Sequence, residues 1–347
     1  MEGYVLFILL LVLCLFLKNK RNQLLLLFFV ITVFSSIRYG IGYDYYSYLA
    51  EASGMKPNTS NELIPRLIED WSGQTIPFLF FVITSFFISF FYYYGIKKAG
   101  YEYLMEVFFY VSFPFLFMNQ LGIIRQGMAT SLVFCAIALR HSKLSIRIAL
   151  LIIAFFCHQS AIVGFLILLP FEKFSRKFLW VLFALGFISA TIIVPVIQMF
   201  VGFGFLGEEG TQKATNYLSE EGLSEGQLMK YLIYIIAIII LANYSKLVKF
   251  NKENKYYIGL IIFGVAIYAL FSFNISLGKR LGMFFFSPAI FVVPQLFKIM
   301  RIPKTVYLMI CIILFSLTIY VGSGNHRDED PPGCSVTYPY RTIFDVL

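Results

Sequence analysis

Long apolar segments alternate with short polar ones along nearly the whole chain. Segments that could cross a bilayer, at about 20 residues each, lie near residues 2–17, 22–38, 76–96, 102–118, 126–140, 148–169, 178–203, 229–245, 256–273, 281–298 and 305–322. Backbone groups inside a bilayer must be paired within the protein, which favours helices. The pattern predicts an all-α, polytopic integral membrane protein with about 10–12 transmembrane or re-entrant helices. We expect a single membrane domain over residues 1–347.

The composition agrees with this pattern. Of the 347 residues, 59% are hydrophobic and 14% are charged, and the mean hydropathy is +0.78, whereas a soluble domain carries about 25% charged residues. The first segment has neither a basic n-region nor a small-residue cleavage site, so we interpret it as a span and not as a signal peptide. Four of the five cysteines lie in apolar segments and no metal-ligand spacing occurs. Neither a disulfide framework, a metal site nor a cofactor is predicted.

Basic residues gather between the apolar segments and indicate an orientation. The net charge of +9 could suggest nucleic acid, but 18 of the 28 Lys and Arg residues fall in six loop clusters, as expected for the cytoplasmic side of a membrane protein. These clusters are Lys18/Lys20/Arg21, Lys97/Lys98, Arg140/Lys143/Arg147, Lys173/Arg176/Lys177, Lys246/Lys249/Lys252/Lys255 and Lys298/Arg301/Lys304. The loops 38–75 and 204–228 and the tail 323–347 are richer in acids, so we expect them on the outer face. The predicted partner is therefore the lipid bilayer and not nucleic acid.

Two neighbouring basic clusters conflict with this orientation. The clusters at 140–147 and 173–177 both favour the cytoplasmic side, yet only about 22 apolar residues separate them, which suffices for one crossing. Either one cluster lies outside, or segment 148–169 enters the membrane and turns back at FCHQS, Phe156 to Ser160. We favour the re-entrant or broken segment, whose irregular backbone must be buried in protein or line a wet cavity.

The first outer loop begins with RYGIGYDYYSYL, Arg38 to Leu49. Arginine and tyrosine are common anchors where a helix leaves the bilayer, which accounts for Arg38 and some of the tyrosines. It does not account for two glycines that allow a sharp bend, or for Asp44 among aromatic rings. We therefore interpret Arg38 and Asp44 as candidate site residues, with Tyr45 and Tyr48 as rings that contact a sugar.

Two further polar groups begin or interrupt apolar helices. Arg125 and Gln126, in MNQLGIIRQGMATS, begin a helix after a short outer turn. A cation there opposes the helix dipole unless an anion also binds; the alternative is an arginine that reaches lipid headgroups. His158, in CHQSA, is polar at membrane depth, where polar groups tend to mark function and histidine can exchange a proton near neutral pH. A lone histidine is nevertheless more often a satisfied core residue.

Two later segments complete the set of candidates. Arg280, in SLGKRLGMFFF, begins another apolar segment on the outer side, where Lys279 could be the lipid anchor. The tail ends in VTYPYRTIFDVL, whose Tyr338 and Arg341 suggest docking on the outer face, the alternative being a frayed terminus. The candidate arginines, with Asp44 and His158, map to one face. Guanidinium groups there suit the phosphate oxygens of an anionic, sugar-bearing ligand.

These motifs occur in the order seen in a known family. RYGIGYDYYSY resembles the RYG-x-G-x-DY-x-x-Y motif of EpsG-type, Wzy-like polysaccharide polymerases, NQLGIIRQGMATS resembles their RQ-x-x-A segment, and FCHQSAIV resembles their FH-x-S-A segment. KRLGMFFF and the tail's YPYRTIF fit the later parts. The resemblance covers nearly the whole chain, although residues 178–275 match only in hydropathy.

The resemblance implies a metal-independent glycosyltransferase of GT-C-like architecture on the outer face of the bacterial cytoplasmic membrane. It would transfer a growing glycan from undecaprenyl diphosphate to a lipid-linked repeat unit of O-antigen, capsule or exopolysaccharide, with a chain-length regulator and a flippase as candidate partners. We expect Arg125 and Arg38 on the diphosphate. His158 would contact the diphosphate or the acceptor hydroxyl and Asp44 a sugar, either of them being the general base. Substrate-binding residues would be Arg280, Gln126, Tyr45, Tyr48, Tyr338 and Arg341.

Three other functions fit a polytopic chain with polar groups at membrane depth. A transporter or flippase should show paired halves or an internal repeat, and the sequence has neither. An O-acetyltransferase would need cytoplasmic access for His158, because its acyl donor would come from that side. Another lipid-dependent glycosyltransferase, such as a mannosyltransferase, should carry acidic pairs in its first outer loop, where Glu69–Asp70 is the only adjacent pair.

Overall fold

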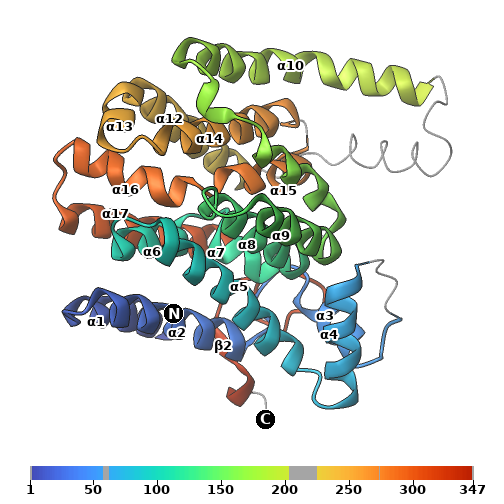
Figure 1. Cartoon of the computed structure of the whole chain (residues 1–347). Coiled ribbons are helices and arrows are strands. Elements are labelled where there is room, and N and C mark those ends of the chain that lie inside the picture. The colour runs from blue at the N-terminus through green and yellow to red at the C-terminus, as the bar shows by residue number, and fades with distance from the viewer. Residues whose placement is uncertain (1, 58–61, 203–224, 273, 346–347) are drawn as a thin grey trace. The chain divides into compact units, whose positions relative to one another are not determined.

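The described part of the chain is mainly helical. A computed structural model describes residues 2–57, 62–202, 225–272 and 274–345 (Figure 1). Within these residues the only strands are β1 (Arg38–Tyr39) and β2 (Arg341–Thr342), which pair antiparallel. The predicted all-α class is therefore confirmed. The outer loop predicted at 204–228 lies outside the described residues as far as residue 224.

Apolar helices of membrane-spanning length occur in the described part of the chain. Three helices are long and apolar enough to cross a membrane: α2 (Lys20–Ile37), α5 (Leu79–Ala99) and α17 (Lys304–Gly322). Two helix pairs, bent by 70° and 64°, raise the number to five if each pair is one span. The shorter apolar helices are Glu2–Phe16, Tyr103–Ser112, Ile124–Ala138, Leu144–Cys157, Gln159–Leu168 and Asn254–Leu270. This arrangement agrees with the polytopic membrane protein predicted from the apolar pattern.

The chain divides into two compact units, which we describe separately. Unit 1 comprises Met1–Phe165 and Arg301–Leu347. Its elements are α1 (Glu2–Leu13), η1 (Cys14–Phe16), α2, β1, α3 (Tyr45–Ala52), α4 (Leu63–Gln74), α5, α6 (Tyr103–Ser112), α7 (Phe117–Gly122), α8 (Ile124–Ala138), α9 (Leu144–Cys157), α17, β2 and η4 (Ile343–Asp345). The single membrane domain expected from the sequence stays a prediction.

The core of unit 1 is built around α8. This helix packs against α5 and α9, and α5 packs in turn against α2. Every residue of α8 except Arg125 is buried. The hydroxyls of Thr130 and Ser131 donate to backbone oxygens of the same helix, at 2.8 and 2.7 Å, so these polar groups lie in the core without unpaired donors. Arg125 is thus the one residue of a buried helix that reaches the surface of the unit.

Unit 2 comprises Leu166–Met300 and is built around α14. Its elements are η3 (Phe171–Lys173), α10 (Arg176–Gly202), α12 (Glu225–Ala242), α13 (Tyr244–Phe250), α14 (Asn254–Leu270), α15 (Ile275–Phe286) and α16 (Ala289–Ile299). Helices α10, α12, α15 and α16 all pack against α14. The Asn254 amide donates to Gln295 Oε1 at 2.8 Å, so a buried polar contact links α14 to α16.

A break in the helical backbone occurs at His158. Helix α9 ends at Cys157, His158 is extended with φ −161° and ψ 123°, and the 3₁₀-helix η2 (Gln159–Leu168) follows. The N–H of His158 still donates to the Ala154 oxygen at 2.9 Å, so the break leaves this donor paired. A break thus lies within Phe156 to Ser160, as predicted, whereas the return of segment 148–169 to the cytoplasmic side stays a prediction.

Candidate active site

The turn after α2 depends on glycine. Gly40 has φ +71° and Gly42 has φ +111°, backbone conformations that glycine adopts at no steric cost. A Cβ atom at Gly42 would lie 2.3 Å from the backbone oxygen of Leu121 in α7. The sharp bend predicted from these two glycines is confirmed, and it lets the turn pack directly on α7.

The close approach at Gly42 gives a testable difference between two glycines. Gly42→Ala should lower the unfolding temperature by several degrees, because it combines a disfavoured φ, worth about 1–3 kcal/mol, with a backbone clash. Gly54→Ala is the matched control, since Gly54 also has a positive φ, +68°, but its Cβ would meet no atom of the described residues within 4 Å. Thermal unfolding of the purified full-length variants measures both. If both variants lowered the unfolding temperature equally, the destabilisation assigned to the backbone clash at Gly42 would be refuted.

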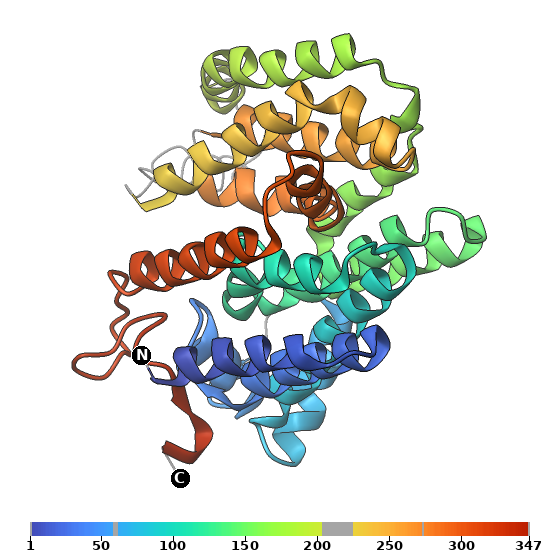
Figure 2. The same cartoon turned by 90° about the vertical axis from the view of Figure 1, so that its left-hand side faces the viewer.

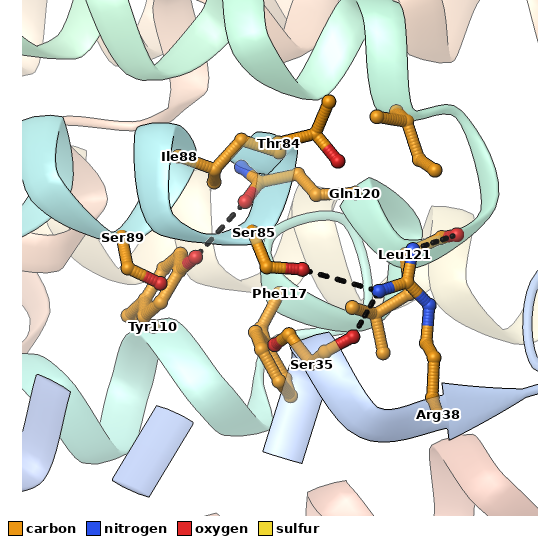
Figure 3. Close-up of a pocket in the computed structure, with 11 residues that line it drawn as sticks. Ser35, Arg38, Thr84, Ser85, Ile88, Ser89, Tyr110, Phe117, Gln120 and Leu121 are labelled. Carbon is orange, nitrogen blue, oxygen red and sulfur yellow. Dashed lines mark hydrogen bonds between the residues drawn. The ribbon is translucent and has the colours of Figure 1, made fainter. Parts of the chain in front are cut away.

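Arg38 lies inside unit 1, beneath this turn. Its side chain is among the fully buried ones, at 1% exposure, and it stacks over the Phe81 ring at 5.3 Å from the centroid. The guanidinium donates to Ser35 O, Ser85 Oγ (3.2 Å) and Leu121 O (3.4 Å) (Figure 3). It also donates to Ile41 O at 3.3 Å. A cavity of about 10 Å³ beside it has room for roughly one water molecule. Arg38 therefore ties the turn to α5 and α7, and the cavity beside it is too small for a phosphate.

Three carboxylates surround the guanidinium of Arg125. Its Nη2 lies 3.1 Å from Glu69 Oε1 and also contacts Glu51 Oε2, and its Nε lies 3.7 Å from Glu62 Oε2. The Arg125 side chain is 17% exposed and that of Glu69 is 1% exposed. Partly buried ion pairs are screened by water and salt much less than surface pairs. One positive charge faces three negative ones, so the cluster is acidic as a whole.

The segment between α2 and α5 supplies all three carboxylates. Glu51 belongs to α3, Glu62 precedes α4, and Glu69 lies in α4. Helices α3 and α4 lie side by side, and α4 also packs on α5 and α9 (Figure 1). On α4 an apolar stripe is exposed, formed by Leu63, Leu67 and Trp71, whereas Glu69 is on the buried side. The amphipathic pattern of α4 thus turns Glu69 toward Arg125.

His158 joins the same cluster through Glu62. The extended backbone at the end of α9 directs its ring so that Nδ1 contacts Glu62 Oε1. Because an ionised carboxylate only accepts hydrogen bonds, this contact places the proton on Nδ1. The imidazole is 23% exposed. The other ring nitrogen, Nε2, makes no hydrogen bond to the described residues. It is therefore the nitrogen that can accept a proton from outside the protein.

Tyr48 lies beside Arg125 on the α3 side, and the charge of Asp44 acts on Tyr48. The Arg125 guanidinium lies 5.1 Å from the centroid of the Tyr48 ring, a favourable cation–π distance. Burial, and after it the charge of Asp44, raises the pKa of the Tyr48 hydroxyl well above its ordinary value. Tyr48 therefore stays neutral and contributes a ring face. Asp44 occupies the N-cap position of α3 and is half-buried.

The C-terminal tail docks on the turn that contains Gly40 and Gly42, which we call the glycine turn. Arg327 donates to the backbone oxygens of Gly40, at 2.6 Å, and Gly42. Its guanidinium lies 4.8 Å from the centroid of the Tyr46 ring and 2.6 Å from Asp330 Oδ1. Burial alone would raise the pKa of the Asp330 carboxyl, but the hydrogen bonds from Arg327 hold the pKa below its ordinary value. Asp330 is therefore charged at neutral pH and keeps Arg327 oriented toward the turn.

The last residues of the tail extend this contact. Strand β2 places Arg341 opposite Tyr39, and the Arg341 Nη2 donates to the Tyr46 hydroxyl at 3.2 Å. The Tyr340 ring stacks on Phe34 with centroids 4.3 Å apart. In Figure 2 the red tail runs from α17 past the beginning of α1, where the Tyr4 hydroxyl donates to the Thr337 oxygen at 2.5 Å. The docking predicted from the aromatic tail is confirmed, with unit 1 as its surface.

The family of the chain follows from comparison with family models. The model of the EpsG family matches residues 21–341, a range that includes the glycine turn, Arg125, His158 and most of the tail. The chain belongs to the EpsG family. It is thus a membrane protein of the polysaccharide-polymerase type, with a glycosyltransferase-like activity. Neither a curated protein nor a solved structure matches it.

In this EpsG-family chain the candidates from the sequence occupy different environments. Arg125 and His158 share one carboxylate, that of Glu62. Gln126 is buried within α8, at 2% exposure, next to Arg125 in the chain. Tyr45 is wholly buried and stacks on Phe81 at 4.3 Å. The structure thus joins Arg125 to His158, and it packs Tyr45 and Tyr48 against protein groups.

The remaining candidates lie on the tail and in unit 2. Tyr338, with a cis bond to Pro339, is 37% exposed, and Arg341 contacts the glycine turn. Arg280 belongs to α15 of unit 2 and is half-buried. Its predicted convergence with the arginines of unit 1 stays a prediction.

The EpsG-family site contains residues that the sequence reasoning missed. From the sequence, Glu51, Glu62 and Glu69 counted only among the acids of loop 38–75, and Arg327 only as part of the tail 323–347. The spacing of Leu63, Leu67 and Trp71 is a signal that could have found Glu69, since an apolar stripe at i, i+4 and i+8 implies a polar opposite face. No comparable local signal marks Glu51 or Glu62.

Proposed function

We propose that this chain is a Wzy-type polymerase with a GT-C-like architecture. It would transfer a growing glycan from undecaprenyl diphosphate to a lipid-linked repeat unit on the outer face of the bacterial cytoplasmic membrane. The product would be O-antigen, capsule or exopolysaccharide. Membership of the EpsG family supports the polymerase type. The distribution of basic clusters supports the orientation, because the first outer loop and the tail carry the acids.

One observation carries the proposal: Arg125, His158 and three carboxylates form a single cluster at the surface of unit 1. Carboxylates accept hydrogen bonds from sugar hydroxyls, and a guanidinium binds phosphate oxygens in a bidentate way. A diphosphate would compete with the glutamates for Arg125, and carboxylate oxygens of the cluster would accept hydrogen bonds from sugar hydroxyls. The cluster thus offers groups of both kinds that a sugar diphosphate requires.

The proposed reaction is a single displacement of the diphosphate by a hydroxyl group. The acceptor hydroxyl oxygen bonds to the anomeric carbon of the donor glycan while the bond from that carbon to the diphosphate oxygen breaks. The hydroxyl proton moves to a base, for which His158 Nε2 and the Asp44 carboxylate are the candidates. Undecaprenyl diphosphate leaves with the bonding electron pair, and Arg125 stabilises the charge that develops on it.

Several of the other sequence candidates have a place in this proposal. Arg38 acts as a positioning residue, since its N–H groups bond to the glycine turn, α5 and α7. Tyr338 and Arg341 of the docked tail, with Gln126 and Arg280, remain proposed binding residues for the glycan and its lipid diphosphate. A chain-length regulator and a flippase are the proposed partners, and no metal ion or cofactor is proposed.

A deletion strain tests this function. Glycan from the strain would be separated on a gel, with and without the wild-type gene supplied in trans. We expect the deletion to leave a single-repeat product at the outer face and the wild-type gene to restore the ladder of longer chains. A ladder that survives the deletion would exclude polymerisation. Loss of even the single repeat would point to transport or to an earlier glycosyl transfer.

A further inference from the structure

His158 is oriented by a carboxylate that also contacts Arg125. The two oxygens of Glu62 face different groups: Oε1 contacts His158 Nδ1, and Oε2 lies 3.7 Å from Arg125 Nε. The Glu62 side chain is 11% exposed, so water competes weakly for these contacts. Glu62 therefore links the proposed base to the proposed diphosphate-binding residue.

The backbone explains why His158 needs such a partner. His158 follows the last residue of α9 and has an extended backbone, so its ring is not set in the regular array of the helix. An imidazole can carry its proton on either nitrogen, and the hydrogen bond at one nitrogen decides the tautomer. The contact with Glu62 keeps the proton on Nδ1 and leaves Nε2 with a free lone pair.

We propose that Glu62 is a positioning residue that fixes the His158 tautomer, so that Nε2 accepts the proton of the acceptor sugar hydroxyl. This proposal rests on the proposed function. It selects His158 over Asp44 as the base. In the transfer step the hydroxyl proton goes to Nε2, and the new glycosidic bond forms as the bond from the anomeric carbon to the diphosphate oxygen breaks. The diphosphate leaves with the bonding electron pair, and the Glu62 carboxylate stabilises the imidazolium that results. When the product leaves, Nε2 returns its proton to water.

The charged groups around His158 set the expected pH dependence. Those in the cluster are Glu62 before α4, Glu69 on α4, Arg125 on α8 and Glu51 on α3, with the neutral Tyr48 beneath Arg125. Removing the Glu62 charge disfavours protonated imidazole. The acid limb of the rate profile should therefore move to lower pH, a shift that a purely structural role for Glu62 does not produce.

The test uses purified full-length variants and the single-repeat lipid extracted from the deletion strain. Polymerisation would be followed between about pH 5 and pH 9, a range that brackets histidine titration. We expect Glu62→Gln to lower kcat by about 10- to 100-fold with little change in KM, and to shift the acid limb to lower pH. Glu62→Asp, which keeps the charge, should recover part of the rate.

Two further variants complete the design. Asp70→Asn is the matched control, since Asp70 lies on α4 but is 55% exposed and pairs with Arg66, and it should behave as wild type. In the double variant Glu62→Gln/His158→Ala, the rate should equal that of His158→Ala alone, because Glu62 acts through His158. If Glu62→Gln does not fold, the polymerisation rate and pH profile of Glu62→Asp test the proposal.

The outcomes separate this proposal from the proposed function. If the wild-type protein forms no polymer from the single-repeat lipid, the polymerase function itself is refuted. If the wild type polymerises and His158→Ala is impaired, but both Glu62 variants keep the wild-type rate and pH profile, the role of Glu62 is refuted. Additive losses in the double variant would also refute it.

Discussion

Replacing Arg125 with alanine should reduce polymer formation by at least about 100-fold, the loss seen when one charge-stabilising donor is removed from an active site. The gel of the complemented deletion strain should then show the single repeat and no ladder. The physical reason is the position of Arg125, the only surface-reaching residue of a buried helix, with its charge next to His158 and Glu62.

A loss of stability has to be separated from this loss of activity. Removing Arg125 leaves Glu51, Glu62 and Glu69 facing one another without a cation, and breaking a buried ion pair costs about 3–5 kcal/mol. Arg125→Lys keeps the positive charge and should keep the fold. It should still form little polymer, because an ammonium group cannot bind phosphate in the bidentate way of a guanidinium.

Arg66 provides the control for this experiment. It lies on α4, 56% exposed, with its Nε 3.9 Å from Asp70, and such surface pairs contribute about 0–1 kcal/mol. Arg66→Ala should therefore form the normal ladder. Protein amounts would be compared by blot. A normal ladder from Arg125→Ala at normal protein level would contradict the role of Arg125 on the diphosphate.

The second large effect is expected at Arg327, outside the cluster. Arg327→Ala removes the hydrogen bonds to the Gly40 and Gly42 oxygens and the ion pair with Asp330. Hydrogen bonds that involve a charged group contribute about 1.5–3 kcal/mol each. The tail should therefore dissociate from the turn, and polymer formation should fall by about 10-fold, a loss equivalent to about 1.4 kcal/mol.

We expect release of the tail to change the position of α3, and thereby the contact of Glu51 with Arg125. The glycine turn precedes α3 directly, and the carboxylate of Glu51, near the end of α3, contacts Arg125. Limited proteolysis of membranes would measure tail release, and the gel would measure chain length. Glu329→Gln, an exposed acid two residues from Arg327, is the control and should change neither. If Arg327→Ala releases the tail but leaves the ladder intact, the tail has no part in positioning the site.

The sequence alone determined the features that depend on local physical chemistry. Hydropathy determined the all-α membrane class, because a bilayer accepts only backbone whose polar groups are paired. Gly40 and Gly42 marked the sharp turn, since only a residue without Cβ fits that backbone. The polar run around His158 marked the break after α9, and the aromatic residues of the tail marked a segment that docks.

Only the tertiary structure decided which of the charged residues meet. Arg38 and Arg125 are similar in sequence terms, both at an end of an apolar helix. The packing of α2, α5 and α7 encloses Arg38, and the packing of α3 and α4 brings three carboxylates to Arg125. Arg125 forms hydrogen bonds with Glu51 and Glu69, which lie 74 and 56 positions before it in the sequence. Such contacts depend on how helices fold back on one another, and no periodicity within a single segment encodes them.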